Sequence, residues 1–406
     1  MTALTYRPLA AQDAERLALY SDPDTCPADA LVPVPLIQEP AFISWQQDIP
    51  RAYLEMAPEE LDVRISRARA ALGTKLVILG HHYQRDEVIK YADFTGDSFK
   101  LSQHAAAQEH AEFVLFCGVH FMAESADILT NPGVRVILPN MAAGCSMADM
   151  ADPDDVYAAW DEITGILGDE ATVIPLTYMN SAASLKSFVG ERNGIVCTSS
   201  NAQKTFAWAF ERGDKILFFP DQHLGRNTGY QMGIPLEDMV LWNWRIPSGG
   251  LTPDQIRKAK VILWQGHCST HQRFSVEQIK KAREEHPGVN VIVHPECRWE
   301  VVQAADDYGS TEKIIKAVSE APAGTTWAVG TEINLVNRLA RQNPDKTVFC
   351  LDPVVCPCST MYRIHPAYIA WVLEGLVQGH VVNEIIVDQE TRKWSLVALE
   401  RMLALP

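Results

Sequence analysis

Cys145, Cys268 and Cys358 have both the residue type and the setting of metal ligands. The chain contains nine cysteines, and this odd number is not typical of a secreted protein cross-linked by disulfides. Cys117 and Cys350 lie inside apolar runs, where a cysteine is typically a small buried hydrophobe. Each of the other three follows an apolar run and stands in a polar or Gly/Pro-rich turn, where a ligand would be placed.

The stretch "VVCPCSTMYRIHP" offers a second candidate at its first cysteine. Cys356 is separated from Cys358 by one proline, and a disulfide between residues so close would be strained. A lone C-x-C pair also does not match the usual zinc spacing, which has two to four intervening residues. Residue type alone therefore leaves both cysteines open as ligands.

Polar side chains that can move protons or bind anions follow three apolar runs, "KLVILGHHY", "TVIPLTYMN" and "NVIVHPE". A small turn with a hydroxyl group lies downstream of each run, as "GDS", "TSS" and "GST". The candidate residues at the run ends and in the turns are His81, Tyr83, Tyr178, Asn180, His294, Glu296, Ser98, Ser199 and Thr311.

The spacing of these features repeats along the chain. His81 and Ser98 are 17 residues apart, as are His294 and Thr311. In the middle copy, Tyr178 and Ser199 are 21 residues apart. His81 precedes Cys145 by 64 residues, and His294 precedes Cys358 by the same number. The repeat register therefore selects Cys358 rather than Cys356. Similar strand and helix lengths can also recur by chance in α/β proteins, and spacing alone leaves that alternative open.

The elements that must position these residues alternate between β-branched runs and amphipathic stretches, which predicts α/β units with parallel sheets in three layers. We expect three such units related by a pseudo-threefold axis around a central site, because ligands bind at the carboxyl ends of parallel strands. The predicted division is an N-terminal extension with a helix (1–70), two α/β domains (71–155 and 156–282), and a third domain with C-terminal helices (283–406).

Three thiolates from three remote loops suit an iron–sulfur cluster better than zinc, because a structural zinc site usually has four ligands that come in close pairs. A [4Fe–4S] cluster held by only three cysteines leaves one iron open. Such an iron can act as a Lewis acid on a hydroxyl or carboxylate group and promote dehydration. The pattern therefore predicts one catalytic cluster per chain.

Composition excludes other classes of function. Of the residues, 47% are hydrophobic and 21% charged, as in a globular protein with a large core. The net charge of −16 argues against nucleic acid or an anionic membrane as the main partner. The first residues do not read as a secretory signal, and no run of about 18 apolar residues is present. We expect a soluble, cytoplasmic protein.

From about residue 70 to 365 the chain resembles the quinolinate synthase family of de novo NAD biosynthesis. The resemblance rests on twelve motifs in order: "GHHYQRDEVI", "GDS", "CGVHFMAESA", "GCSMAD", "YMNSAASLK", "CTSSNA", "FPDQHLGR", "WQGHCSTH", "HPE", "GST", "GTE" and "CSTMYRI". It implies three α/β domains that each give one cysteine to a [4Fe–4S] cluster. The ligands would be Cys145, Cys268 and Cys358, since the family's last ligand precedes a C-x-x-M pattern. Where some members have C-x-x-C-x-x-C, this chain has C-x-C.

The resemblance also implies an activity and residue roles. The enzyme, a transferase, would condense iminoaspartate with dihydroxyacetone phosphate, losing phosphate and two waters, with L-aspartate oxidase as the supplier of iminoaspartate. His294 and Glu296 would form the acid/base pair, with Tyr178 and Tyr83 also catalytic. His81, Asn180 and His271 would contact the substrate.

The substrates are anionic, yet the matched motifs contain no cluster of Arg or Lys. Ser98, Ser199 and Thr311 would then hold carboxylate and phosphate groups at helix N-termini, unless they are ordinary N-caps. Two rival functions remain. Another hydro-lyase with an open iron would share the cysteines but not the phosphate-holding turns, and a non-catalytic iron–sulfur sensor would not need "HPE" and "YMN" at strand ends.

Overall fold

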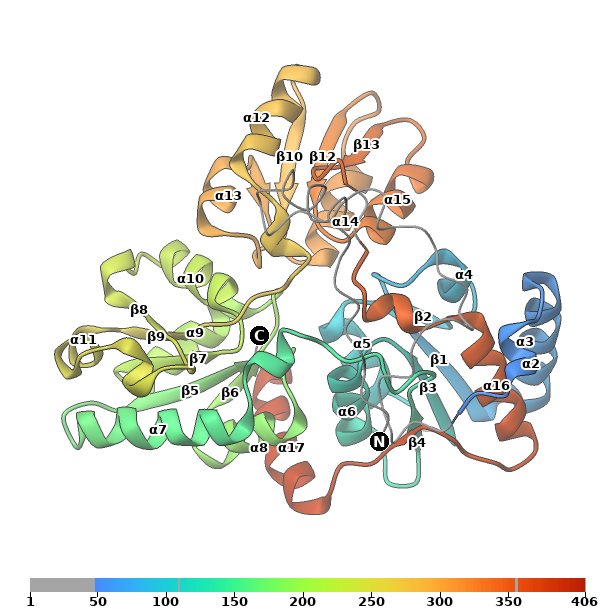
Figure 1. Ribbon diagram of the computed structural model, residues 1–406, viewed down its shortest axis with the longest axis horizontal. Helices are drawn as coiled ribbons and strands as arrows, with labels where there is room; N and C mark the ends of the chain where they lie inside the picture. The colour runs from blue at the N-terminus through green and yellow to red at the C-terminus, as the bar shows by residue number, and fades with distance from the viewer. Residues whose placement is uncertain (1–47, 109, 355–356, 406) are drawn as a thin grey trace, which may run out of the picture.

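The computed structural model describes residues 48–108, 110–354 and 357–405. Figure 1 shows three lobes of strands and helices around a common centre. Residues 1–47, the first part of the predicted N-terminal extension, lie outside the described residues, as does Cys356. The described part of the N-terminal extension forms two helices, α2 (Arg51–Leu54) and α3 (Pro58–Leu72).

The first lobe is built on a sheet with the strand order β14-β4-β3-β1-β2. Its parallel strands are β1 (Leu76–His81), β2 (Phe94–Gly96), β3 (Phe113–Cys117) and β4 (Arg135–Ile137). The connecting helices are α4 (Asp86–Ile89), α5 (Ser98–Ala106) and α6 (His120–Leu129).

The second lobe has the order β6-β5-β7-β9-β8, all parallel. The strands are β5 (Val173–Tyr178), β6 (Ile195–Cys197), β7 (Lys215–Phe219), β8 (Met239–Trp242) and β9 (Val261–Trp264). The helices are α7 (Pro153–Leu167), α8 (Ala183–Glu191), α9 (Ala202–Phe210), α10 (Gln222–Gln231) and α11 (Pro253–Lys258).

The third lobe has the order β11-β10-β12-β13, again parallel. The strands are β10 (Asn290–Val293), β11 (Asp307–Tyr308), β12 (Thr326–Gly330) and β13 (Thr347–Cys350). The helices are α12 (Val276–Glu285), α13 (Trp299–Ala304), α14 (Thr311–Glu320) and α15 (Ile333–Gln342).

All three sheets share one arrangement. The first strand of each lobe (β1, β5 or β10) lies between the second (β2, β6 or β11) and the third (β3, β7 or β12). The prediction of an α/β protein with parallel sheets is therefore confirmed. Because the first three strands have the same order in each lobe, their ends occupy equivalent places in the three lobes, as the repeated spacing requires.

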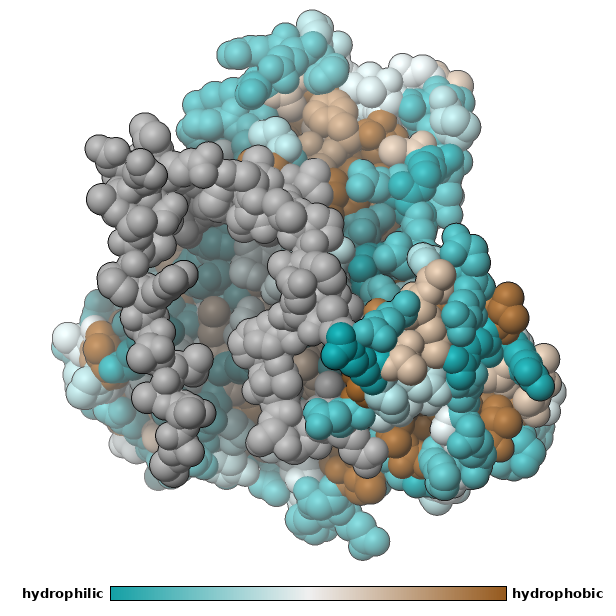
Figure 2. Space-filling view, turned by 45° about the vertical axis from the view of Figure 1, so that its right-hand side comes forward, coloured by the Kyte–Doolittle hydropathy of each residue, from teal (hydrophilic) through white to brown (hydrophobic). Residues whose placement is uncertain are grey.

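Burial explains why these segments become strands and helices. Every residue of β5 and β7 is buried, as expected for strands covered by helices on both faces. Helix α14 buries Thr311, Ile314 and Val318, which recur on one side at helical spacing. On the face drawn in Figure 2, hydrophilic residues cover most of the described surface. No helix within the described ranges is long and apolar enough to cross a membrane.

The end of the chain returns to the first two lobes (Figure 1). Helix α16 (Pro366–Val377) packs on α3, and Glu374 at its far end accepts hydrogen bonds from Arg64 at 2.7 and 2.8 Å. Strand β14 (Glu384–Ile385) pairs antiparallel with β4, and α17 (Gln389–Leu403) packs against α8. The sequence predicted these elements to be part of the third domain (283–406). The domain boundaries themselves stay a prediction.

The contact between α8 and α17 depends on a glycine. A methyl group added at Gly190 would collide with the backbone carbonyl of Trp394, which no change of side-chain rotamer can relieve. We expect Gly190→Ala to lower the free energy of unfolding by about 1–3 kcal/mol. Urea denaturation measures the change. The matched control is Gly165→Ala in α7, where the added methyl group meets nothing within 4 Å. Equal stability of the two variants would contradict the close packing.

Candidate active site

A cavity of about 600 Å³, counting its open mouth, lies where the three lobes meet. The first strand of each lobe ends at it, with His81 at the end of β1, Tyr178 at the end of β5 and His294 just after β10. Apart from His271, every site residue predicted from the sequence lines this cavity: His81, Tyr83, Ser98, Cys145, Tyr178, Asn180, Ser199, Cys268, His294, Glu296, Thr311 and Cys358.

The three cysteines share one local structure. Each stands three residues before a short 3-10 turn, and its carbonyl oxygen accepts a hydrogen bond from the backbone N–H four residues later. The turns are Ala148–Met150, His271–Arg273 and Met361–Arg363, and the donors are Asp149 (3.0 Å), Gln272 (2.9 Å) and Tyr362 (2.9 Å). Cys358 therefore has the same backbone geometry as the other two cysteines. The repeat register gave the same equivalence.

Burial and the charges of neighbouring thiols both affect the pKa values of the three cysteines that line the cavity. Burial raises the pKa of Cys145 to about 12, and it also raises the pKa values of Cys268 and Cys358. The charge of Cys358 would raise the pKa of both other cysteines further. Backbone N–H groups from the following turns point at each sulfur and oppose this effect. In the absence of a metal such thiols are protonated, and a bound cation converts them to thiolates.

These observations test whether the residues suit an iron–sulfur cluster. Three soft sulfur donors reach one cavity from three loops, and each sulfur is approached by N–H groups of the kind that tune cluster sulfurs. None of the three takes part in a disulfide. The donor set suits a cluster with three protein ligands.

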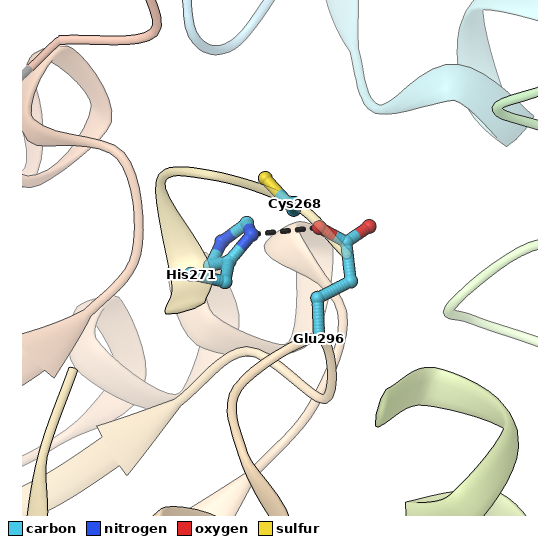
Figure 3. Close-up of side chains that lie close together, drawn as sticks. All are labelled: Cys268, His271 and Glu296. Carbon is cyan, nitrogen blue, oxygen red and sulfur yellow. Dashed lines mark ion pairs between the residues drawn. The ribbon is translucent and has the colours of Figure 1, made fainter. Parts of the chain in front are cut away.

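A second arrangement at the same place has donor types that could hold a single metal ion. The ligand atoms of Cys268, His271 and Glu296 lie within 4.8 Å of one another (Figure 3). However, His271 Nδ1 is only 2.7 Å from Glu296 Oε2, whereas two ligands of a tetrahedral zinc ion are about 3.3 Å apart. The shorter distance is that of an ion pair between imidazole and carboxylate.

Glu296 is the centre of a buried acid–base network. Its side chain accepts a hydrogen bond from the Tyr178 hydroxyl at 2.7 Å and pairs with His271, whose ring stacks on that of His294 with centroids 4.4 Å apart. Burial alone would raise the pKa of Glu296, but the contacts with His271 and Tyr178 hold it below its usual range. The site thus keeps a carboxylate next to a phenol whose pKa is raised by burial.

His271 lies behind the cavity rather than on its wall. Its Nε2 is 3.0 Å from Thr331 Oγ1, and Thr331 in turn is 2.9 Å from the Tyr83 hydroxyl. His271 is 1% exposed. The predicted contact of His271 with substrate stays untested, but its position indicates that it acts through Glu296 and Thr331.

His81 and His294 occupy equivalent turns in the first and third lobes. The Nδ1 atom of His81 accepts a hydrogen bond from the Tyr83 N–H at 3.1 Å, and that of His294 from the Glu296 N–H at 3.3 Å. Burial lowers the pKa of each imidazole to about 3. Both rings are therefore neutral at physiological pH and can donate a hydrogen bond from Nε2.

The hydroxyl turns lie at helix N-termini that open onto the cavity. Ser98 is the first residue of α5, Thr311 is the first of α14, and Ser199 precedes α9 by three residues. The helix caps are the preceding residues: Asp97 accepts from the Lys100 N–H at 2.9 Å, and Ser310 from the Lys313 N–H at 3.4 Å. Ordinary N-capping is therefore not the role of Ser98 or Thr311.

Part of the site was not predicted from the sequence. Asp97, Thr198 and Thr360 also line the cavity, beside an apolar wall of Phe99, Val119, Phe121, Met122, Met147 and Met361. Thr331 lies in the quoted motif "GTE", to which no role was assigned. The position of Thr331 could have indicated its role. It follows the third strand of its lobe, and residues after parallel strands lie at the same edge of the sheet.

Comparison with known proteins gives one consistent result. The family described as "Quinolinate synthetase A protein" matches residues 63–404. The quinolinate synthase of Corynebacterium glutamicum is 60% identical over 365 residues, which cover 90% of this chain and 92% of the relative. That of Acidobacterium capsulatum is 58% identical, covering 86% and 94%, and that of Streptomyces coelicolor is 56% identical, covering 86% and 90%.

The lowered pKa values of His81 and His294 give a prediction. In the apoprotein, NMR signals of these two labelled imidazoles should not shift between about pH 8 and about pH 5, because both rings stay neutral over that range. The same rings in urea-unfolded protein are the control and should titrate near 6.5. A midpoint near 6.5 in the folded protein would show that water reaches the imidazoles.

Proposed function

The chain belongs to the quinolinate synthetase A protein family, and from that premise we propose that it condenses iminoaspartate with dihydroxyacetone phosphate to form quinolinate. The observation that carries the proposal is the convergence of three cysteines and a buried acid–base network on one cavity. The two substrates account for all atoms of quinolinate, phosphate and two waters. The overall reaction needs no external oxidant or reductant.

We infer that Cys145, Cys268 and Cys358 hold a [4Fe–4S] cluster, since their sulfurs line one cavity and each receives backbone N–H groups. When bound, a cluster with three protein ligands supplies a Lewis acid for the loss of water. Thiolate ligands require a reducing compartment, which supports a cytoplasmic location.

Glu296 and Tyr178 are the groups best placed to move protons. Closing the pyridine ring and losing two waters requires proton removal from carbon and nitrogen and proton delivery to departing oxygens. The Glu296 carboxylate can accept a proton, and the phenol hydrogen-bonded to it at 2.7 Å can donate one. His271 supports this exchange from behind, through its contact with the other carboxylate oxygen.

Substrate anions must be held without cationic side chains, because no Lys or Arg appears among the described residues that line the cavity. The N-termini of α5, α9 and α14 supply N–H groups and a partial positive charge, and Ser98, Ser199 and Thr311 add hydroxyls. Oδ1 of Asn180 is buried without a hydrogen-bond partner among the described residues, so it can accept from a substrate N–H or O–H.

The rival functions are less well supported. An iron–sulfur sensor has no use for a buried Tyr178–Glu296–His271 network, and a hydro-lyase without a phosphorylated substrate has no use for three anion-binding turns. The decisive experiment is anaerobic assay of the iron-loaded protein with iminoaspartate, generated in the assay, and dihydroxyacetone phosphate. Iron-loaded protein that forms no quinolinate would refute the proposal. Whether L-aspartate oxidase supplies the iminoaspartate stays a prediction.

Glu296→Gln tests the acid–base assignment. The substitution keeps the size of the side chain but removes its proton-accepting charge, so kcat for quinolinate formation should fall about 100-fold or more while the iron content is unchanged. Glu300→Gln, the same substitution at an exposed position of the same lobe, is the control. Near-normal turnover by Glu296→Gln would remove this residue from the mechanism.

A cysteine series tests the ligand set. Cys358→Ala should lose iron after anaerobic reconstitution, whereas Cys350→Ala should keep it, because Cys350 does not line the cavity. Cys356→Ala should also keep its iron and substantial activity, since the repeat register places the ligand two residues later. The measurement is the iron content of each of the three variants after reconstitution. Loss of iron from Cys356→Ala with retention in Cys358→Ala would show that the register is wrong.

A further inference from the structure

Two fully buried carboxylates lie at equivalent positions after the third strands of the second and third lobes. Asp221 follows β7 and caps α10, and Glu332 follows β12 and caps α15; both are 0% exposed. One oxygen of each performs the capping. Asp221 Oδ1 accepts from two backbone N–H groups at 2.7 Å, and Glu332 Oε2 accepts from two at 2.8 and 3.4 Å.

The second oxygen of Glu332 is directed at a cysteine loop. Oε1 accepts a hydrogen bond from the backbone N–H of Cys358 at 3.2 Å and another from Asn334 Nδ2 at 2.9 Å. The carboxylate therefore ties the start of α15 to the residue whose sulfur lines the cavity. Asp221 lies beside the backbone N–H of Cys268, but its Oδ2 has no hydrogen-bond partner among the described residues.

The first lobe shows that this turn does not need a carboxylate. Its equivalent cap residue before α6 is Val119, which has no side-chain acceptor. The next N–H there, that of His120, bonds to the Ala143 carbonyl at 2.8 Å instead. Because the fold builds the turn with valine, helix capping alone does not explain a fully buried carboxylate, whose desolvation is costly.

We propose that Glu332 is a positioning residue for the metal centre, which holds the backbone of Cys358 so that its sulfur faces those of Cys145 and Cys268. This inference rests on the proposed iron–sulfur site. It agrees with the general behaviour of metal centres, in which groups that fix the ligands affect metal affinity about 10- to 100-fold.

Glu332→Ala tests the proposal through metal retention rather than turnover. After anaerobic reconstitution, we expect the variant to release iron to a chelator about tenfold faster than the unmodified protein. Glu332→Gln keeps one acceptor oxygen but replaces the other with an NH2 group, so it should release iron at a rate between those of Glu332→Ala and the unmodified protein. Asp388→Ala is the matched control, because Asp388 caps α17 through one oxygen and contacts no cysteine. Equal release rates for Glu332→Ala and the unmodified protein would overturn the proposal.

Amide exchange of the unmodified apoprotein tests the same contact without any variant. With ¹⁵N-labelled cysteine, the Cys358 N–H should exchange with solvent slowly, because a buried carboxylate oxygen holds it. Exchange as fast as in an unstructured peptide would refute the contact even if Glu332→Ala fails to fold. If the unmodified protein takes up no iron, the cluster assignment fails and the positioning role fails with it, whereas the exchange result still tests the contact between Glu332 and the Cys358 N–H.

Discussion

The structure depends on one geometric constraint: in a parallel sheet, all strands end at the same edge, and three such edges meet at one cavity. This constraint makes neighbours of site residues that are far apart in the chain. Tyr178 at the end of β5 donates a hydrogen bond to Glu296 after β10, and Tyr83 after β1 contacts Thr331 after β12. Because the first three strands of each lobe have the same order, each lobe places polar side chains, a hydroxyl turn and a cysteine at the cavity.

Burial then decides the protonation state of the titratable side chains that lie near the strand ends. It raises the pKa of the three thiols, lowers those of His81 and His294, and leaves Glu296 as a carboxylate only because His271 and Tyr178 stabilise its charge. The cavity therefore has neutral imidazoles and helix N-termini where an anion would otherwise meet lysine or arginine. This arrangement suits substrates with several negative charges that must also be released as product.

Segments outside the repeated pattern help to fix the positions of the lobes relative to one another. The chain end runs from α16 on the first lobe, through β14, to α17 on the second, where Gly190 allows the helix backbones to approach closely. Between the first and third lobes, Arg338 donates to the carbonyl oxygen of His82 at 2.8 Å. Contacts of this kind fix the distances between strand ends, on which the spacing of the cysteines depends.

The sequence by itself determined the fold class, because apolar runs and amphipathic stretches report local periodicity. It also identified twelve of the residues that line the cavity, because they follow strand ends or recur at a fixed spacing along the chain. The same backbone turn follows each of the three cysteines. Only tertiary structure placed His271 behind Glu296, gave the helix caps to Asp97 and Ser310, and tied Glu332 to Cys358. These depend on distances between atoms of separate elements, often in different lobes, and no periodicity within one segment records such distances.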